Sequence, residues 1–218
     1  MSQIVKKKYL PDTQYHPGKG KLILEAARGL FAHYGYTKVT MEEVADEVGV
    51  VKGSIYYYFP TKEQLFHAVI SNEQEIFLTK IAQLLAEEKS AKDKIRVYVE
   101  CRQRYFRDMV NLSQLDYSSL IKVTLNFSDL FHEFENREVV ILQGVFETGN
   151  RTGEFNIKDS LRVALMFLHL LQGLRLRSMR DSTPPHRDTG KYSSLNKEIN
   201  LFVMIFLEGI KQTSDTEI

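Results

Sequence analysis

The stretch that begins at Thr40 constrains the fold more than any other, because its pattern predicts two short helices joined by a tight turn. Thr40 can accept a hydrogen bond from the amide three positions on, and Glu43 can reach back to the amide of Thr40. Gly49 follows the last apolar position, where helices often end in a left-handed backbone that glycine adopts without strain. We therefore expect helices over 40–48 and 52–58.

The second of these helices carries three consecutive tyrosines, which cannot all face a core because successive helical residues point about 100° apart. We expect its inward side to hold Val50, Ile55 and Phe59. The outward side is expected to hold Lys52, Ser54, Tyr57 and Tyr58, with Tyr56 between the two sets and Gly53 leaving room for close approach. Exposed phenol and ammonium groups can contact phosphate and sugar. The pattern thus favours a helix that enters a DNA groove.

A second capping box follows directly. Thr61 precedes the next predicted helix, and Gln64 lies three residues further on. Lys62 falls in the first turn of that helix, where backbone amides can also hold a phosphate. We therefore count Lys62 among the candidate DNA contacts.

The order and spacing of these residues resemble the tetracycline-repressor (TetR) family of bacterial transcription regulators, over roughly residues 20–70. The matching positions are Phe31, Gly35, Thr40, Val44, Ala45, Gly49, Val50, Gly53, Tyr56, Tyr58, Phe59, Lys62 and Leu65. The resemblance implies DNA contacts from Thr40, Lys52, Ser54, Tyr57, Tyr58 and Lys62, and a bracing role for Tyr56 that reaches a phosphate. Val51 stands where many members carry a capping Ser, so we expect the start of this helix to be less well capped.

Charge is distributed unevenly along the chain, although the formal net charge is only +1. Residues 1–21 contain five lysines against the single Asp12, whereas the following helical part up to residue 66 has more acidic than basic residues. The basic N-terminal arm has two possible roles: a solvated tail, or an arm that follows the phosphates or the minor groove. DNA binding would otherwise depend on a few placed contacts rather than on a polycationic surface.

The remaining composition suggests a cytoplasmic protein. A single cysteine excludes an internal disulfide and favours a reducing compartment. The first residues lack the apolar core of a signal peptide. The longest apolar run, Leu201 to Leu207, is far shorter than the ~20 residues that span a bilayer. We therefore expect no membrane partner.

The fold is predicted to be all-α, because helical periodicity continues to the end of the chain and strand patterns are weak. Helices are expected at 19–34, 40–48, 52–58, 62–86, 92–110, 112–122, 127–150, 159–179 and 195–212. Residues 180–194, rich in Ser, Thr, Pro and Gly, are expected to form a loop. The expected organisation is an arm over 1–18, a three-helix helix-turn-helix DNA-binding domain over 19–66, and a helical ligand-binding and dimerisation domain over 67–218.

The last two predicted helices are apolar on nearly every side, which indicates burial on every side. A domain of this size cannot easily surround both, so we expect one face to pack in the protomer and the other on a second copy. A monomer with two central helices is the alternative. The family resemblance also implies a homodimer through these helices. Candidate interface residues are Leu161, Leu165, Leu168, Gln172, Phe202, Ile205 and Phe206.

TetR-like proteins usually hold a small molecule among their middle helices, and its binding moves the two DNA-binding domains of the dimer apart. Candidate ligand-lining residues are Phe77, Tyr98, Cys101, Tyr105, Met109, Tyr117, Phe127, Phe131, Phe134 and His169. Each has ordinary core packing as its alternative role, and Cys101 is either a redox sensor or an inert buried thiol. The abundance of Phe and Tyr favours an apolar or aromatic effector. No cofactor motif and no specific metal-ligand spacing is present.

Three classes of function remain to be compared. A ligand-responsive dimeric repressor on an inverted-repeat operator fits best, and an activator is possible within the same family. An enzyme ranks far below, because no nucleophile elbow, P-loop or paired-carboxylate motif is present. The third class is a DNA-binding regulator whose helical domain binds a protein partner instead of a small molecule. A cavity among the middle helices, or its absence together with an exposed apolar patch, would discriminate these two regulators.

Overall fold

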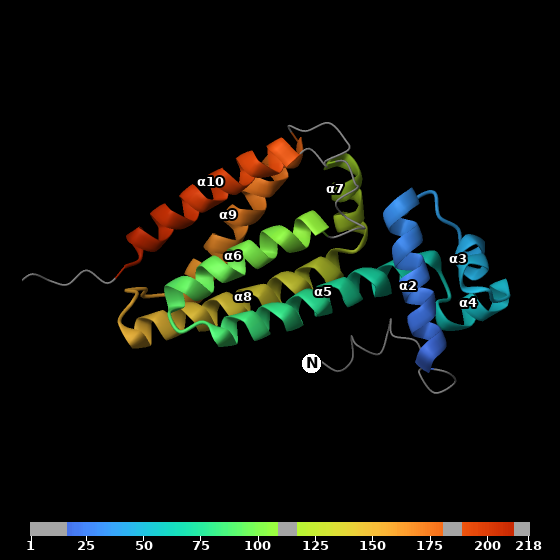
Figure 1. The fold of residues 1–218 in the computed structure, drawn as a ribbon, viewed down its shortest axis with the longest axis horizontal. Helices are drawn as coiled ribbons and strands as arrows, with labels where there is room; N and C mark the ends of the chain where they lie inside the picture. Colours follow the sequence, from blue (N-terminus) through green and yellow to red (C-terminus); the bar gives the residue numbers. More distant parts are fainter. Residues whose placement is uncertain (1–16, 109–116, 181–188, 212–218) are drawn as a thin grey trace, which may run out of the picture. The chain divides into compact units, whose positions relative to one another are not determined.

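The computed structural model describes residues 17–108, 117–180 and 189–211, and within these ranges it consists of helices without a strand (Figure 1). The helices are α2 (Pro17–Tyr34), α3 (Met41–Val48), α4 (Lys52–Tyr58), α5 (Lys62–Glu87), α6 (Ala91–Asp108), α7 (Tyr117–Asn126), α8 (Ser128–Thr152), α9 (Ser160–Arg180) and α10 (Thr189–Gly209). The all-α prediction is confirmed. The basic arm, apart from its last residues, lies outside the described residues.

Helix limits agree with the sequence pattern in most places, and α4 has the predicted limits. Two limits differ. Helix α7 ends at Asn126 rather than at 122, and its predicted start at 112 lies outside the described residues. Helix α10 begins at Thr189, so the predicted loop over 180–194 is wrong at its end. Ser and Thr are frequent in loops and also at helix starts, which explains the error.

The chain divides into two compact units, and the first comprises α2, α3, α4 and the beginning of α5 as far as Ile76. Its core is fully buried at Ile23, Phe31 and Leu65. The ring of Phe31 packs edge-on against Phe66 of α5, with 5.3 Å between centroids. These contacts hold α2 against α5, and α3 packs against both α2 and α4.

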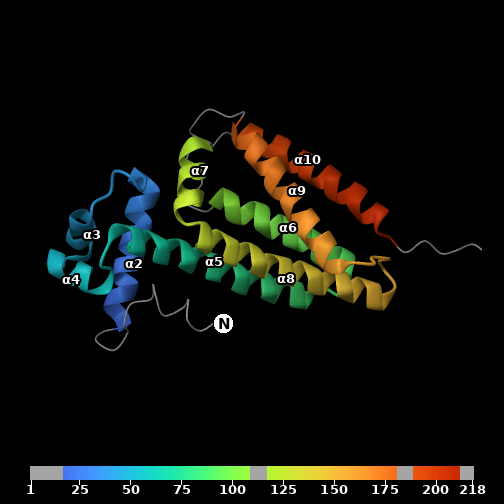
Figure 2. The same cartoon turned by 180° about the vertical axis from the view of Figure 1, so that it is seen from behind.

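The second unit begins at Phe77 and contains α6 to α10 together with the end of α5. Helix α8 lies against α6 and α9, and α9 lies beside α10, as Figures 1 and 2 show from opposite sides. Phe146 of α8, Phe167 of α9 and Phe206 of α10 form its aromatic centre, with the rings of Phe167 and Phe206 4.7 Å apart.

The turn after α8 joins three helices of this unit. Gly153 has φ 75°, a left-handed conformation that ends α8, and the ring of Phe155 then folds back over Gly149. The carboxylate of Glu154 accepts hydrogen bonds from the amides of Ala91 (2.9 Å) and Lys92 (3.2 Å) at the start of α6. An acidic group at this end satisfies free amides and complements the helix dipole.

Candidate nucleic-acid interface

The turn between α3 and α4 has the predicted geometry. The amide of Glu43 donates to Thr40 Oγ1 (3.2 Å), and the amide of Thr40 donates to Glu43 Oε2 (2.7 Å). Gly49 ends α3 with φ 72° and ψ 37°, and its amide donates back into the last turn. Because both ends of α3 are fixed, the direction in which α4 leaves the turn is also fixed.

Helix α4 is anchored by its buried side. Ile55 and Phe59 are 0% and 1% exposed, as predicted, while Val50 is half-buried. Tyr58 was expected on the outer side and is instead buried, at 9% exposure, so that prediction is wrong. Tyr58 lies about 60° from Ile55 around the helix, close enough to share the anchoring side.

The outer face of α4, which we define as Val51, Lys52, Gly53, Tyr56 and Tyr57, is open to solvent. Tyr57 is 62% exposed and Tyr56 is 42% exposed, whereas Ser54 is half-buried. The helix starts without a side-chain cap at Val51, as expected from the sequence. A short helix with aromatic and basic side chains on its free side fits a DNA major groove.

Lys52 already has a partner. Its Nζ lies 3.1 Å from Glu42 Oε2 of α3, and both side chains are largely exposed. The hydrogen bond to Glu42 and its negative charge raise the pKa of Lys52 above the ordinary value. An exposed pair of this kind is weak, so a phosphate can take the place of Glu42.

A second basic group lies at the start of α5. Lys62 Nζ donates to the carbonyl of Thr37 (3.2 Å) and sits 4.6 Å from the ring centre of Tyr36. Partial burial lowers the pKa of Lys62. The hydroxyl of Tyr36 donates to Glu63 Oε1 (3.0 Å), and the amide of Gln64 donates to Thr61 Oγ1 (3.1 Å), the first half of the second capping box. Lys62 is therefore held in place beside α4, and Tyr36 was not foreseen as its support.

The candidate ligand-lining residues of the second unit form an aromatic cluster from three helices. The rings of Phe77 (α5) and Tyr105 (α6) are 4.5 Å apart, and Phe134 (α8) lies 5.7 Å from Phe77. Phe77, Phe134 and Cys101 are buried, whereas Phe127 and Phe131 are half-buried. Burial raises the pKa of the Cys101 thiol, which favours the inert role over a redox sensor.

Three further candidates are placed differently. His169 was expected on an inner face, but its side chain is 59% exposed and its Nε2 lies 2.8 Å from Glu135 Oε1. The inward positions of α9 are taken by Ala164, Phe167, Leu168 and Leu171, and 169 lies about 100° further round than 168. Met109 lies outside the described residues. Tyr117 begins α7, and its side chain is not among those described.

A buried polar cluster lies next to the aromatic one, and sequence reasoning missed two of its three members. Glu138 Oε1 accepts from the hydroxyl of Tyr98 (2.6 Å) and from Arg102 Nε (2.8 Å), and all three side chains are buried. Burial alone would lower the pKa of Arg102, but the Glu138 carboxylate raises it, so the guanidinium stays charged. Arg102 and Glu138 each follow an inward aromatic residue by four positions, which was the available signal.

The candidate interface residues on α9 and α10 divide into two groups. Leu161 and Ile205 are 46% and 61% exposed. Leu165, Gln172 and Phe202 are half-buried. Leu168 and Phe206 are buried in the protomer, so their expected outward position is wrong. The outward apolar residues that the sequence did not single out are Met166, Leu170, Leu201 and Met204.

The described ranges lack two further kinds of feature. They contain no group of three or more His, Cys, Asp or Glu side chains placed to hold a metal ion. No helix among them is long and apolar enough to cross a membrane.

The family model for bacterial regulatory proteins of the tetR family matches residues 23–69, which cover α3, α4 and the start of α5. The crystal structure of a transcriptional regulator from Cytophaga hutchinsonii ATCC 33406 is 37% identical, with a TM-score of 0.80 over 90% of this chain and 100% of that one. The chain belongs to the TetR family.

This TetR-family protein is therefore a DNA-binding transcription regulator. It is 26% identical to the HTH-type transcriptional regulator QacR of Staphylococcus aureus (strain Mu50 / ATCC 700699), over 87% of this chain and 97% of QacR. The fold is shared with FadR from Bacillus subtilis in complex with stearoyl-CoA, at 20% identity and a TM-score of 0.67, covering 84% of this chain and 97% of FadR.

Proposed function

We propose that this regulator is a homodimeric repressor, which binds an inverted-repeat operator through α4 and is released by a small apolar or aromatic effector. The observation that carries the proposal is the outer face of α4, where Tyr57 and Lys52 are exposed to solvent while Ile55 and Phe59 are buried on the opposite side of the helix. Side chains on such a helix read base edges, and those beside it hold phosphates.

The proposed DNA contacts fall into two roles. Tyr57, Lys52 and Gly53 on α4 lie where a groove-entering helix meets base edges and sugars. Thr40 and Lys62 lie at the starts of α3 and α5, where backbone amides and an ammonium group hold phosphates. Tyr56 is a second exposed tyrosine on the outer face of α4. Tyr58 is buried, so it contributes by anchoring α4 rather than by contacting DNA.

The proposed dimer rests on the outward apolar residues of α9 and α10. Leu201, Met204 and Ile205 lie within two turns of α10, and Met166 and Leu170 lie one turn apart on the neighbouring α9. Exposed apolar residues gathered on neighbouring helices mark a candidate interaction site. Two-fold pairing of these helices makes a four-helix bundle, and it places two copies of α4 about one DNA turn (~34 Å) apart or somewhat more.

The proposed effector site is the surroundings of the Phe77, Tyr105 and Phe134 cluster in the second unit. The aromatic rings favour an apolar or aromatic molecule. The structure of FadR from Bacillus subtilis, which shares this fold, is a complex with stearoyl-CoA, and this supports an effector with an apolar part. To act as an inducer, the molecule must bind more tightly to the conformation of the dimer in which the spacing of the two DNA-binding domains does not fit DNA.

The experiment that tests the dimer compares two substitutions. Ile205→Glu places a charge in the proposed interface, and Val140→Glu places one on α8 at a residue that is equally apolar and 67% exposed. We expect Ile205→Glu to sediment as a monomer and to bind an inverted repeat no better than a half-site. Val140→Glu should remain a dimer. A dimeric Ile205→Glu protein would contradict the proposed interface.

A further inference from the structure

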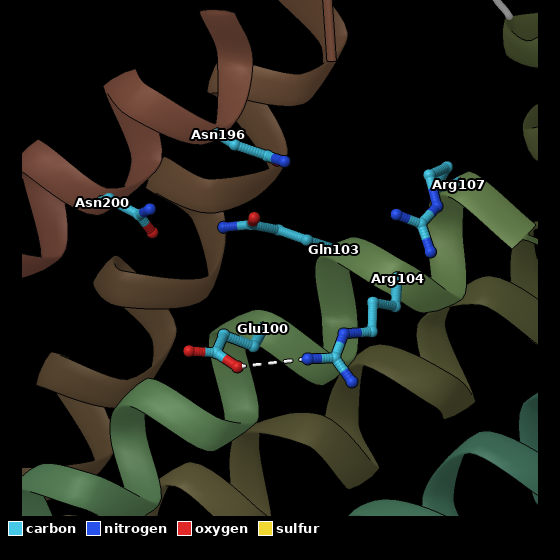
Figure 3. A pocket seen from close by; sticks show the side chains of 6 residues that line it. All are labelled: Glu100, Gln103, Arg104, Arg107, Asn196 and Asn200. Carbon is cyan, nitrogen blue, oxygen red and sulfur yellow. Dashed lines mark hydrogen bonds and ion pairs between the residues drawn. The ribbon is translucent and has the colours of Figure 1, made fainter. Parts of the chain in front are cut away.

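A polar groove lies between α6 and α10, within the second unit. Its volume is about 230 Å³, and its lining residues are Glu100, Gln103, Arg104, Arg107, Asn196 and Asn200. Figure 3 shows Gln103 pointing from α6 towards the two asparagines of α10, with both arginines beside it. The lining contains no apolar side chain, in contrast to the aromatic cluster proposed for the effector.

The groove and the aromatic cluster lie on different sides of α6. Successive residues turn by about 100°, so Glu100, Gln103 and Arg107 share one side of the helix. Tyr98 and Tyr105 point roughly in the opposite direction, where they meet Glu138 and Phe77. The groove is therefore a separate candidate site rather than an extension of the effector site.

Gln103 supplies the observation that points to a ligand. Its side-chain nitrogen Nε2 is inaccessible to solvent and has no hydrogen-bond partner among the described residues. A buried donor without an acceptor is unfavourable in a folded protein, and such groups are few. A turn of the amide towards the groove would let an acceptor-rich molecule there satisfy this donor.

The charges of the groove indicate the sign of that molecule. Arg104 and Arg107 outnumber the single acidic residue, Glu100. Arg104 Nη2 lies 3.4 Å from Glu100 Oε2, and the two side chains are 65% and 62% exposed. A pair this exposed adds little stability, so Arg104 can exchange Glu100 for a ligand carboxylate or phosphate at small cost.

We propose that this groove binds a small organic anion, whose carboxylate or phosphate group is held by Arg104 and Arg107. The amides of Gln103, Asn196 and Asn200 supply the remaining hydrogen bonds, since an amide can both donate and accept. The volume suits a compact molecule, because pockets for drug-sized ligands start at about 300 Å³.

The test measures binding of sodium citrate and of inorganic phosphate to the full-length protein by calorimetry, without DNA and at constant ionic strength set with sodium chloride. We expect saturable binding of at least one of the two probes. Citrate without phosphate assigns a carboxylate ligand, and phosphate without citrate assigns a phosphorylated one. Absence of saturable binding for both probes overturns the proposal.

Two variants locate the site, and a third serves as the matched control. Arg104→Gln should weaken binding about tenfold or more, whereas Arg96→Gln, which removes an equally exposed arginine paired with Asp93 on the same helix, should change it less than about twofold. Gln103→Met removes the unpartnered donor, so we expect weaker binding with an unchanged or higher unfolding temperature. Equal affinity for all variants would overturn the proposal, because the binding would then lie elsewhere.

Discussion

Replacement of Gly149 by alanine tests the packing of the turn after α8. A Cβ atom at this position would overlap the ring of Phe155 at Cδ2 and Cε2, and would still lie only 2.8 Å from Cγ. Carbon atoms pack at about 3.5–4.0 Å, so the ring would have to retreat by more than ~1 Å. Phe155 is only 4% exposed and lies against Phe146, so it has little room to move.

The magnitude follows from two opposing effects. Overpacking of a core side chain costs about 1–3 kcal/mol, and the short distances here place the cost near ~3 kcal/mol. Alanine gains at most ~1 kcal/mol over glycine in a helix. The expected net loss is about 2 kcal/mol in the free energy of unfolding, which is roughly 4–8 °C in unfolding temperature for a chain of this size.

Thermal unfolding of Gly149→Ala beside Gly144→Ala checks this reasoning. Gly144 lies on the same helix, but a Cβ atom there meets nothing within 4 Å. We therefore expect Gly144→Ala to raise the unfolding temperature by a few degrees, about 2–4 °C, and Gly149→Ala to lower it. Two variants that unfold at the same temperature would refute the proposed contact between Gly149 and Phe155.

Three further predictions concern the DNA-binding face and the start of α6. Tyr57→Ala should weaken operator binding, measured by fluorescence anisotropy, by about 1 kcal/mol or more per subunit and leave the unfolding temperature nearly unchanged. Tyr58→Ala should instead lower the free energy of unfolding by about 3 kcal/mol. The reverse result in the two assays would exchange the roles of these tyrosines. Lys62→Ala should flatten the salt dependence of DNA affinity by about 0.9 per subunit in slope, and an unchanged slope would remove Lys62 from the phosphate contacts. Burial raises the pKa of Glu154, but the hydrogen bonds from the α6 amides outweigh burial, and the pKa in the folded protein is lowered. The stabilisation by the ionised carboxylate is therefore present above the ordinary pKa of about 4.3 and is lost as the pH falls through the lower pKa of the folded protein. Glu154→Gln should therefore be about 1 kcal/mol less stable than the native protein at pH 7 and indistinguishable from it near pH 2, and an equal difference at both pH values would contradict the ionised contact.

The geometry of α4 shows how far the sequence pattern can be taken. With Ile55 and Phe59 as the inward pair, Tyr57 lies about 180° from the middle of the buried side, so its outward position could be predicted. Tyr56 and Tyr58 each lie about 80° from that middle, on opposite sides. Helical periodicity alone could not decide between them, and packing buries Tyr58.

The second unit was less predictable because its signals are not local. The apolar stretches 163–171 of α9 and 201–207 of α10 have so few polar residues that the sequence could not mark which apolar side faces the core, and Leu168 and Phe206 were assigned to the wrong side. The pairing of Arg102 with Glu138 joins residues 36 positions apart and follows from the way α6 crosses α8. The caps at Thr40 and Gly49, in contrast, depend on neighbours within one turn and were predicted correctly.

The most direct test of the central claim is a selection of binding sites from a random DNA pool by the full-length protein. We predict an inverted repeat whose half-sites are about one DNA turn apart, and a loss of this selection in the Tyr57→Ala variant. Recovery of no sequence preference, at salt low enough for tight binding, would contradict sequence reading by α4.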